Sequence, residues 1–194
     1  MSAEPAILRR CEADGFRVFR GAWNVNLIGV RSSNRDQAGD LFDDWIHVVF
    51  QDDAEHWIDL AFRATTDPGN RWMTAPMRSA GCAIMAAGHQ YRGLWRLGLH
   101  RGKVPALCQV GVCKFYRDND RDKILDMDPD TLTEGVVGLN LHPSGSGNTE
   151  RIGLWSAGCQ VLGGPQSDFD ILLAICRRSA EIYGPRFSYT LIED

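Results

Sequence analysis

The chain has 194 residues, of which 44% are hydrophobic and 24% are charged, and its formal net charge is -4 at pH 7. This length and composition are typical of one globular domain that buries a substantial core. The acidic balance gives no electrostatic reason to expect a nucleic-acid partner, because phosphate binding needs a basic surface.

The N-terminus, MSAEPAILRRCEADGF, lacks the apolar segment of a secretory signal, and no stretch reaches the roughly 18 apolar residues of a membrane span. We therefore expect a protein without a membrane span that is cytoplasmic when made, or that leaves by a route with no local signal. The six cysteines are too sparse for a disulfide scaffold, and Cys108 and Cys113 do not have a zinc-site spacing. We expect free thiols, no metal and no other cofactor.

No repeat or low-complexity tract divides the chain, so residues 1–194 are predicted to form a single, mainly β (α+β) domain. A short helix over Pro5–Asp14 is expected within a helical lead-in of residues 1–20. After it, apolar runs alternate with turn clusters such as TTDPGN and HPSGSGN. These runs predict strands at Val25–Arg31, Trp45–Phe50, Trp57–Ala64, Gly93–Leu99, Leu107–Tyr116, Val136–His142 and Gly153–Leu162.

One strong helix is predicted near the C-terminus, capped by Ser167, with Asp170 completing a capping-box pattern. Gly184 and Pro185 are expected to end it, and a closing strand follows over residues 187–191. The apolar positions that share one helical face are Phe169, Leu172, Leu173, Cys176, Ala180 and Tyr183.

The candidate reactive pair is Cys159 and His142, in the segment GLNLHPSGSGNTERIGLWSAGCQVL. A hairpin-like return between two strands would place the imidazole beside the sulfur, where it stabilises the thiolate and later protonates a leaving amine. Gly158 is a plausible device for exposing backbone N–H groups to an oxyanion. The alternative is that Cys159 is a small buried apolar residue and His142 an ordinary surface residue. A single cysteine and a single histidine in a sequence more often have these structural roles.

His142, thirteen intervening residues and then Ser156-Ala157-Gly158-Cys159 resemble the signature of the L,D-transpeptidase catalytic domain, the YkuD-like family. The resemblance implies a β-sandwich or barrel with a helix after the cysteine segment, and residues 138–175 carry it most specifically. It also implies that Cys159 is acylated by a peptidoglycan stem peptide and that His142 is its base. ATTDPGN and HQYRGLWRLGLH, between residues 60 and 110, resemble the family more weakly.

Two positions depart from the family's pattern: Ala157 stands where a second histidine is usual, and Val161 stands where an arginine binds the substrate carboxylate. Arg92, Arg96 or Arg101 could take the role of that arginine. The chain also resembles compact phage and prophage proteins with a WSAGCQV version of the motif. That resemblance implies peptidoglycan hydrolysis by an endolysin-like enzyme that acts on the cell wall after release.

Further candidates for substrate binding surround the pair: Ser156, Trp155, Tyr91, His100 and Arg92. Each has an ordinary structural alternative as a core, turn or surface residue. The acidic run over residues 116–130 resembles the start of a calcium loop, but Lys123 and Pro129 stand where an EF-hand needs glycine and glutamate. A solvated acidic turn is therefore favoured there over a bound cation.

The leading hypothesis is a peptidoglycan stem-peptide hydrolase, an L,D-carboxypeptidase or endopeptidase that works through an acyl-enzyme on Cys159. Two alternatives stay open. The same site could crosslink peptides as an L,D-transpeptidase if an amine replaces water. A degenerate domain of this fold could instead serve as a wall-binding or virion module, which Ala157 and Val161 would favour.

Overall fold

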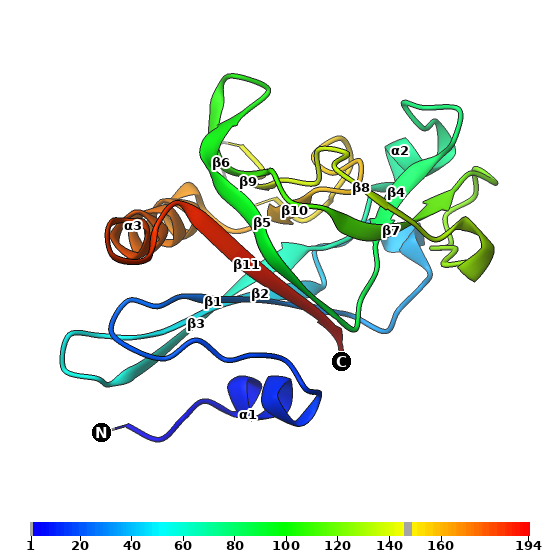
Figure 1. Ribbon diagram of the computed structural model, residues 1–194. Coiled ribbons are helices and arrows are strands. Elements are labelled where there is room, and N and C mark those ends of the chain that lie inside the picture. The colour runs from blue at the N-terminus through cyan, green and yellow to red at the C-terminus, as the bar shows by residue number, and fades with distance from the viewer. Residues whose placement is uncertain (1, 146–148) are drawn as a thin grey trace.

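The computed structural model describes residues 2–145 and 149–194, and Figure 1 shows their arrangement. Eight strands form a closed barrel in the order β1, β11, β5, β6, β9, β10, β3, β2. Their bounds are β1 Asn26–Arg31, β2 Asp44–Gln51, β3 Trp57–Thr65, β5 His89–His100, β6 Val104–Gln109, β9 Leu141–Pro143, β10 Gln160–Leu162 and β11 Arg186–Glu193. The prediction of a mainly β chain is confirmed.

A smaller sheet and three helices accompany the barrel. The sheet contains β4 (Cys82–Met85), β7 (Cys113–Asp118) and β8 (Thr133–Gly135) and lies to one side of the barrel in Figure 1. The helices are α1 Ala6–Ala13, α2 Asn70–Thr74 and α3 Gln166–Tyr183, and short 3-10 turns occur at Gln37–Gly39 and Pro129–Thr131. None of the helices in the described residues has the length and apolar character needed to cross a membrane.

The long hairpin of β2 and β3 follows directly from its alternating sequence. The two strands pair antiparallel from Asp44 opposite Ala64 to Gln51 opposite Trp57. Ile46 and Val48 are fully buried in the barrel core, whereas the neighbouring Trp45 is exposed. This alternation matches the two-residue period of a strand with one wet face, so the strands predicted here are confirmed.

The predicted C-terminal helix is confirmed as α3, and its apolar face packs on the barrel core. Phe169, Leu172 and Cys176 are fully buried in the main hydrophobic cluster. The predicted cap is wrong: the helix begins at Gln166 with Pro165 at its N-cap, so Ser167 lies inside the first turn. Proline at this boundary has no N–H to leave unpaired and its fixed φ suits the chain entering a helix.

The predicted strand Leu107–Tyr116 is wrong in extent, because the chain leaves the barrel in its middle. Residues up to Gln109 pair with β5, and residues from Cys113 pair with β4 and β8 in the smaller sheet. The backbone bends at Gly111, where a Cβ would lie 2.9 Å from the carbonyl oxygen of Gly93. One apolar run therefore serves two sheets, which its local pattern does not reveal.

The predicted strands Val136–His142 and Gly153–Leu162 shrink to the three-residue strands β9 and β10. Before β9, the side-chain oxygen Oε1 of Gln109 accepts the backbone N–H groups of Val137, Gly138 and Leu139. One amide oxygen thus replaces a strand ladder for three residues. The predicted turn HPSGSGN lies partly outside the described residues, at 146–148.

A buried arginine joins the ends of several strands. Arg31 is completely buried at the end of β1, and its Nε lies 2.8 Å from Oδ1 of Asp67. Its guanidinium also donates to the hydroxyl and carbonyl of Thr66 and to the carbonyl of Met85. Burial and the nearby Asp67 raise the pKa of Asp44 to about 7. Arg31 therefore supplies the positive charge that balances the buried carboxyl groups of Asp67 and Asp44.

We expect Arg31→Met to lower the free energy of unfolding by about 3–5 kcal/mol, because it leaves a buried carboxylate without its partner. Urea unfolding followed by circular dichroism measures this loss. Arg177→Met on the exposed face of α3 is the control and should change stability by no more than about 0.5 kcal/mol. Equal stability of the two variants would contradict the proposed role of Arg31.

Candidate functional site

Cys159 and His142 are brought together by the pairing of two very short strands. β9 and β10 are parallel, with Leu141 opposite Gln160 and His142 opposite Val161. Leu141 faces the barrel core, so the alternating residues His142 and Cys159 share the outer face of the wall. The hairpin-like return expected from the sequence is wrong, because a parallel pair needs a crossover. The proximity expected from it is nevertheless present.

His100, from the end of β5, completes a three-residue cluster. Its ring stacks on that of His142 with centroids 4.2 Å apart and an interplanar angle of 29°. One ring nitrogen of each histidine and Sγ of Cys159 lie within 4.8 Å of one another. The structure thus places His100, a residue proposed from sequence to line the cleft, in direct contact with the predicted base.

Hydrogen bonds assign the tautomers of the two histidines. Nδ1 of His142 lies 2.9 Å from the carbonyl oxygen of Pro143, so Nδ1 carries the hydrogen and Nε2 carries a lone pair. That Nε2 is buried and has no hydrogen-bond partner in the described part of the chain. Asn140 accepts from the N–H of Gln109 and donates to Nδ1 of His100, so the hydrogen of His100 is on Nε2. The site therefore holds a base atom on His142 and an imidazole N–H donor on His100.

The reactive pair is neutral in the resting protein. Burial lowers the pKa of His142 to about 4, and the nearby His100 and Arg101 act in the same direction. Cys159 retains some exposed surface, yet the dense protein around it raises the pKa of its thiol to about 11. The charge of Arg101 and the N–H of Asn140 lower that pKa but do not overcome burial. The thiol donates to the carbonyl oxygen of Gly138 at 3.4 Å.

The turn that carries Cys159 is fixed by Ser156 and Gly158. The hydroxyl of Ser156 donates to the carbonyl of Cys159 at 2.7 Å and accepts the N–H of Gly158 at 3.1 Å. Gly158 has φ +120°, and a Cβ there would lie 2.2 Å from the carbonyl oxygen of Ala83. Only glycine fits this close approach. The N–H of Gly158 is thus engaged within the turn, and the buried Ser156 holds the nucleophile loop rather than substrate.

Gln160 anchors the other side of the same turn. Its Nε2 donates to the carbonyls of Thr66 and Gly158, and its Oε1 accepts the hydroxyl of Tyr189 at 2.8 Å. Thr66 is also bound by Arg31, so the buried cation is connected to the nucleophile turn through one amide side chain. The turn that carries Cys159 is therefore connected, through Gln160 and Thr66, to the buried Arg31.

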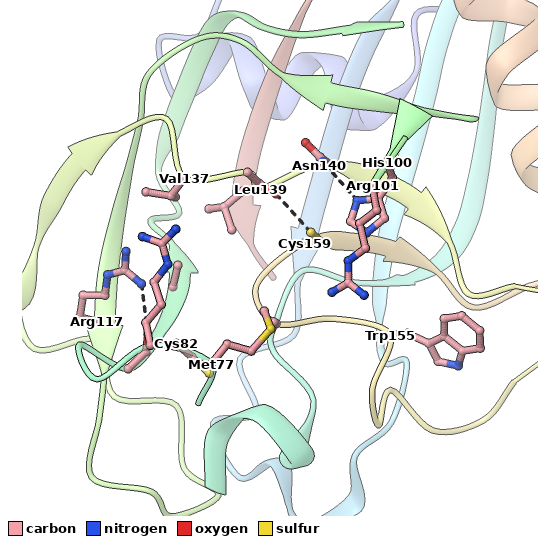
Figure 2. A pocket seen from close by; sticks show the side chains of 15 residues that line it. Met77, Cys82, His100, Arg101, Arg117, Val137, Leu139, Asn140, Trp155 and Cys159 are labelled. Atoms are coloured by element: carbon pink, nitrogen blue, oxygen red, sulfur yellow. Dashed lines mark hydrogen bonds between the residues drawn. The ribbon is translucent and has the colours of Figure 1, made fainter. Parts of the chain in front are cut away.

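Two hollows flank the pair, and Cys159 lines one of them while His142 lines the other. A hollow of about 280 Å³ contains Cys159 and is shown in Figure 2. A second, of about 540 Å³, is lined by His142 and by apolar residues such as Ile152 and Leu154. His100, Arg101 and Trp155 line both hollows. Trp155 is 45% exposed, so its predicted place beside the cleft agrees with the structure.

Two residues predicted for substrate binding are not part of this site. Tyr91 is buried, and its hydroxyl donates to the carbonyls of Ala86 and Lys114. Arg92 lies over the ring of Phe19, 4.9 Å from its centroid. Of the arginines considered as replacements for the one missing at Val161, Arg101 lines both hollows, whereas Arg92 lines neither. Arg92 lies within β5 and Arg101 lies in the turn directly after it, a difference that the sequence alone does not connect with the site.

Other contributors to the site were not predicted. Arg78 and Arg117 line the hollow of Cys159, and Asn140 and Gln109 hold its wall. These residues come from separate segments, and only the strand pairing brings them together. No local spacing in the sequence could have linked them.

Among the residues that the structure describes, two groups of side chains have donor atoms close enough together to hold a metal ion: His100, His142 and Cys159, and the acidic cluster Asp118, Asp120 and Asp126. In the first, the bond from Asn140 keeps the hydrogen of His100 on Nε2, which leaves that atom without a lone pair for a metal. In the second, Asp118 is buried, and its carboxylate accepts the N–H of Asp126. Neither arrangement identifies a cofactor.

No family model, no curated protein and no solved structure matches the chain. The features of the chain that bear on its function are therefore the geometry of this site and the motif around Cys159. Both concern the same few residues on β9, β10 and the turn between Trp155 and Cys159.

We expect the rate of Cys159 alkylation by iodoacetamide to rise about tenfold per pH unit from pH 7 to 10, because the thiol pKa is raised to about 11 and only the thiolate reacts. Peptide mass spectrometry follows the modified residue, and Cys159→Ser identifies its signal. A rate that levels off below pH 8 would contradict the neutral resting pair.

Proposed function

We propose that the protein is a cysteine-dependent hydrolase of peptide amides whose substrate is the peptidoglycan stem peptide. The observation that carries the proposal is the close grouping of His142 and Cys159, in which Nε2 of His142 is buried and has no hydrogen-bond partner among the described residues. The substrate class is supported by the likeness of His142 and Ser156–Cys159 to the L,D-transpeptidase motif. A mainly β barrel with the helix α3 after the cysteine segment is compatible with that likeness.

The neutral pair determines the order of events. Sγ of Cys159 attacks the amide carbonyl while its proton passes to Nε2 of His142, and the Nε2–H of His100 donates to the developing oxyanion. The imidazolium of His142 then protonates the leaving amine as the C–N bond breaks, which leaves a thioester. His142 next removes a proton from water, which attacks the thioester and releases the carboxylate product and the thiol.

Two other functions are favoured by specific observations. The second hollow, beside His142, has room for an amine that could replace water and give a crosslink. A non-catalytic wall-binding module is favoured by the raised thiol pKa and by the engaged N–H of Gly158. Products of digestion separate the three functions.

We expect purified sacculi incubated with the protein to yield shortened stem peptides, measured by mass spectrometry of the muropeptides. Cys159→Ser should abolish this change, and His142→Gln should slow it at least about 100-fold, because a general base contributes at least that much. Cys108→Ser is the matched control, since this half-buried thiol lines neither hollow. New dimers would indicate crosslinking, and profiles identical for wild type and Cys159→Ser would indicate the binding module.

We also expect a broad pH profile for the acylation step, nearly flat between about pH 5 and 10. Below pH 4 His142 becomes protonated and loses its lone pair, and above pH 11 the thiol ionises, so the neutral pair predominates between these limits. Single-turnover rates on a soluble stem peptide test this. A narrow bell with limbs between pH 6 and 9 would point instead to a thiolate–imidazolium pair.

A further inference from the structure

The hollow that contains Cys159 is strongly cationic. Arg78, Arg101 and Arg117 line it, and no aspartate or glutamate does so within the described residues. Arg78 and Arg101 are exposed, and Arg117 is half-buried. Figure 2 shows Arg101 next to Cys159 and Arg117 farther from it, at the opposite side of the hollow, where it donates to the carbonyl of Gly81. This concentration of positive charge stands out in a chain whose net charge is -4.

The positive charge of the hollow is not neutralised by the surrounding protein. None of the three arginines forms an ion pair within the part of the chain that the structure describes. Arg117 donates to the carbonyl of Gly81 and lies over the ring of Phe115, contacts that orient it without cancelling its charge. Burial and the nearby Arg78 lower the pKa of Arg117, which places two uncompensated cations close together.

Arg101 brings the third charge next to the chemistry. It follows His100 directly and has φ +51°, a left-handed conformation at the tight turn between β5 and β6. Its charge acts on all three members of the cluster, lowering the pKa of Cys159, His142 and His100. A ligand held by Arg101 would therefore lie within reach of the thiol.

We propose that the hollow lined by Arg78, Arg101 and Arg117 binds the acyl donor through free carboxylates, so that the substrate is a peptide with at least two carboxylate groups close to the scissile amide. This inference rests on the proposed function. Guanidinium groups bind carboxylates through paired hydrogen bonds, and three of them exceed what one carboxylate needs. The volume of about 280 Å³ suits one or two acidic residues rather than a bulky ligand.

The test compares two alkylating reagents that differ only in charge, iodoacetate and iodoacetamide. Both react with the thiolate, so the ratio of their rates at Cys159 is independent of the thiol pKa. We expect the ratio of the iodoacetate rate to the iodoacetamide rate to be higher at Cys159 than at the thiol of free glutathione. We expect this preference to fall about threefold for each arginine changed to glutamine, as for a unit charge about 6 Å away in a hydrated site. It should also weaken as the salt concentration rises.

The variants are Arg78→Gln, Arg101→Gln, Arg117→Gln and the triple combination, with Arg177→Gln on α3 as the control. Circular dichroism and thermal unfolding confirm that each variant is folded before it is compared. A ratio in the triple variant equal to that of wild type, or an equal change in Arg177→Gln, would overturn the inference. The same variants are then tested on stem peptides with free and with amidated carboxylates.

The two proposals fail in different ways. If anion preference depends on the arginines but sacculi are not digested, the carboxylate site stands as a binding site and the proposed hydrolase is wrong. If digestion proceeds but neither reagent preference nor amidation depends on the arginines, the hydrolase stands and the carboxylate site is wrong. Discrimination of about tenfold against amidated peptides, lost in the triple variant, would support both.

Discussion

The site depends on a buried cation that makes no contact with substrate. Arg31 is sealed inside the end of the barrel and ties Asp67 and Thr66, which follow β3, to Met85 at the end of β4. A buried charge of this kind is costly unless every group around it is satisfied, so its partners are held in one arrangement. Because Gln160 bonds to the same Thr66 carbonyl, this constraint extends to the nucleophile turn. The barrel end and the turn are thus joined by one hydrogen-bonded network.

A second constraint explains why the site occupies an irregular part of a regular barrel. In long paired strands, the backbone N–H and C=O groups bond to the neighbouring strand, which leaves no room for a hollow. Around the site, side chains do this instead: Gln109 accepts three consecutive N–H groups, and Ser156 bonds to both sides of the Gly158 turn. The strands β9 and β10 can then be only three residues long. Polar side chains in fixed positions replace the ladder that the site interrupts.

The features that could be predicted from sequence are those that depend on local patterns of residues. The alternation of apolar and polar residues predicted the strands β2 and β3, and the helical spacing of apolar residues predicted the buried face of α3. The parallel pairing of β9 with β10 could not be predicted, because nothing local distinguishes it from a hairpin. The cationic hollow was equally hidden, since Arg78, Arg101 and Arg117 come from a loop, a turn and a strand. Cys159 and His142 were predicted because their motif is local, whereas the residues that surround them are joined only by the fold.

The charge of the hollow also affects the pKa values of the reactive pair, Cys159 and His142. Burial keeps Cys159 and His142 neutral, and Arg101 opposes the ionisation of His142 while favouring that of the thiol. A carboxylate bound to Arg101 would cancel much of its field, which raises both pKa values. His142 then becomes a stronger base, and the thiol, although harder to ionise, becomes more nucleophilic once its proton leaves. Binding of an anionic substrate therefore makes His142 a stronger base and the thiolate a stronger nucleophile, while the difference between the two pKa values, which drives the proton transfer, changes little.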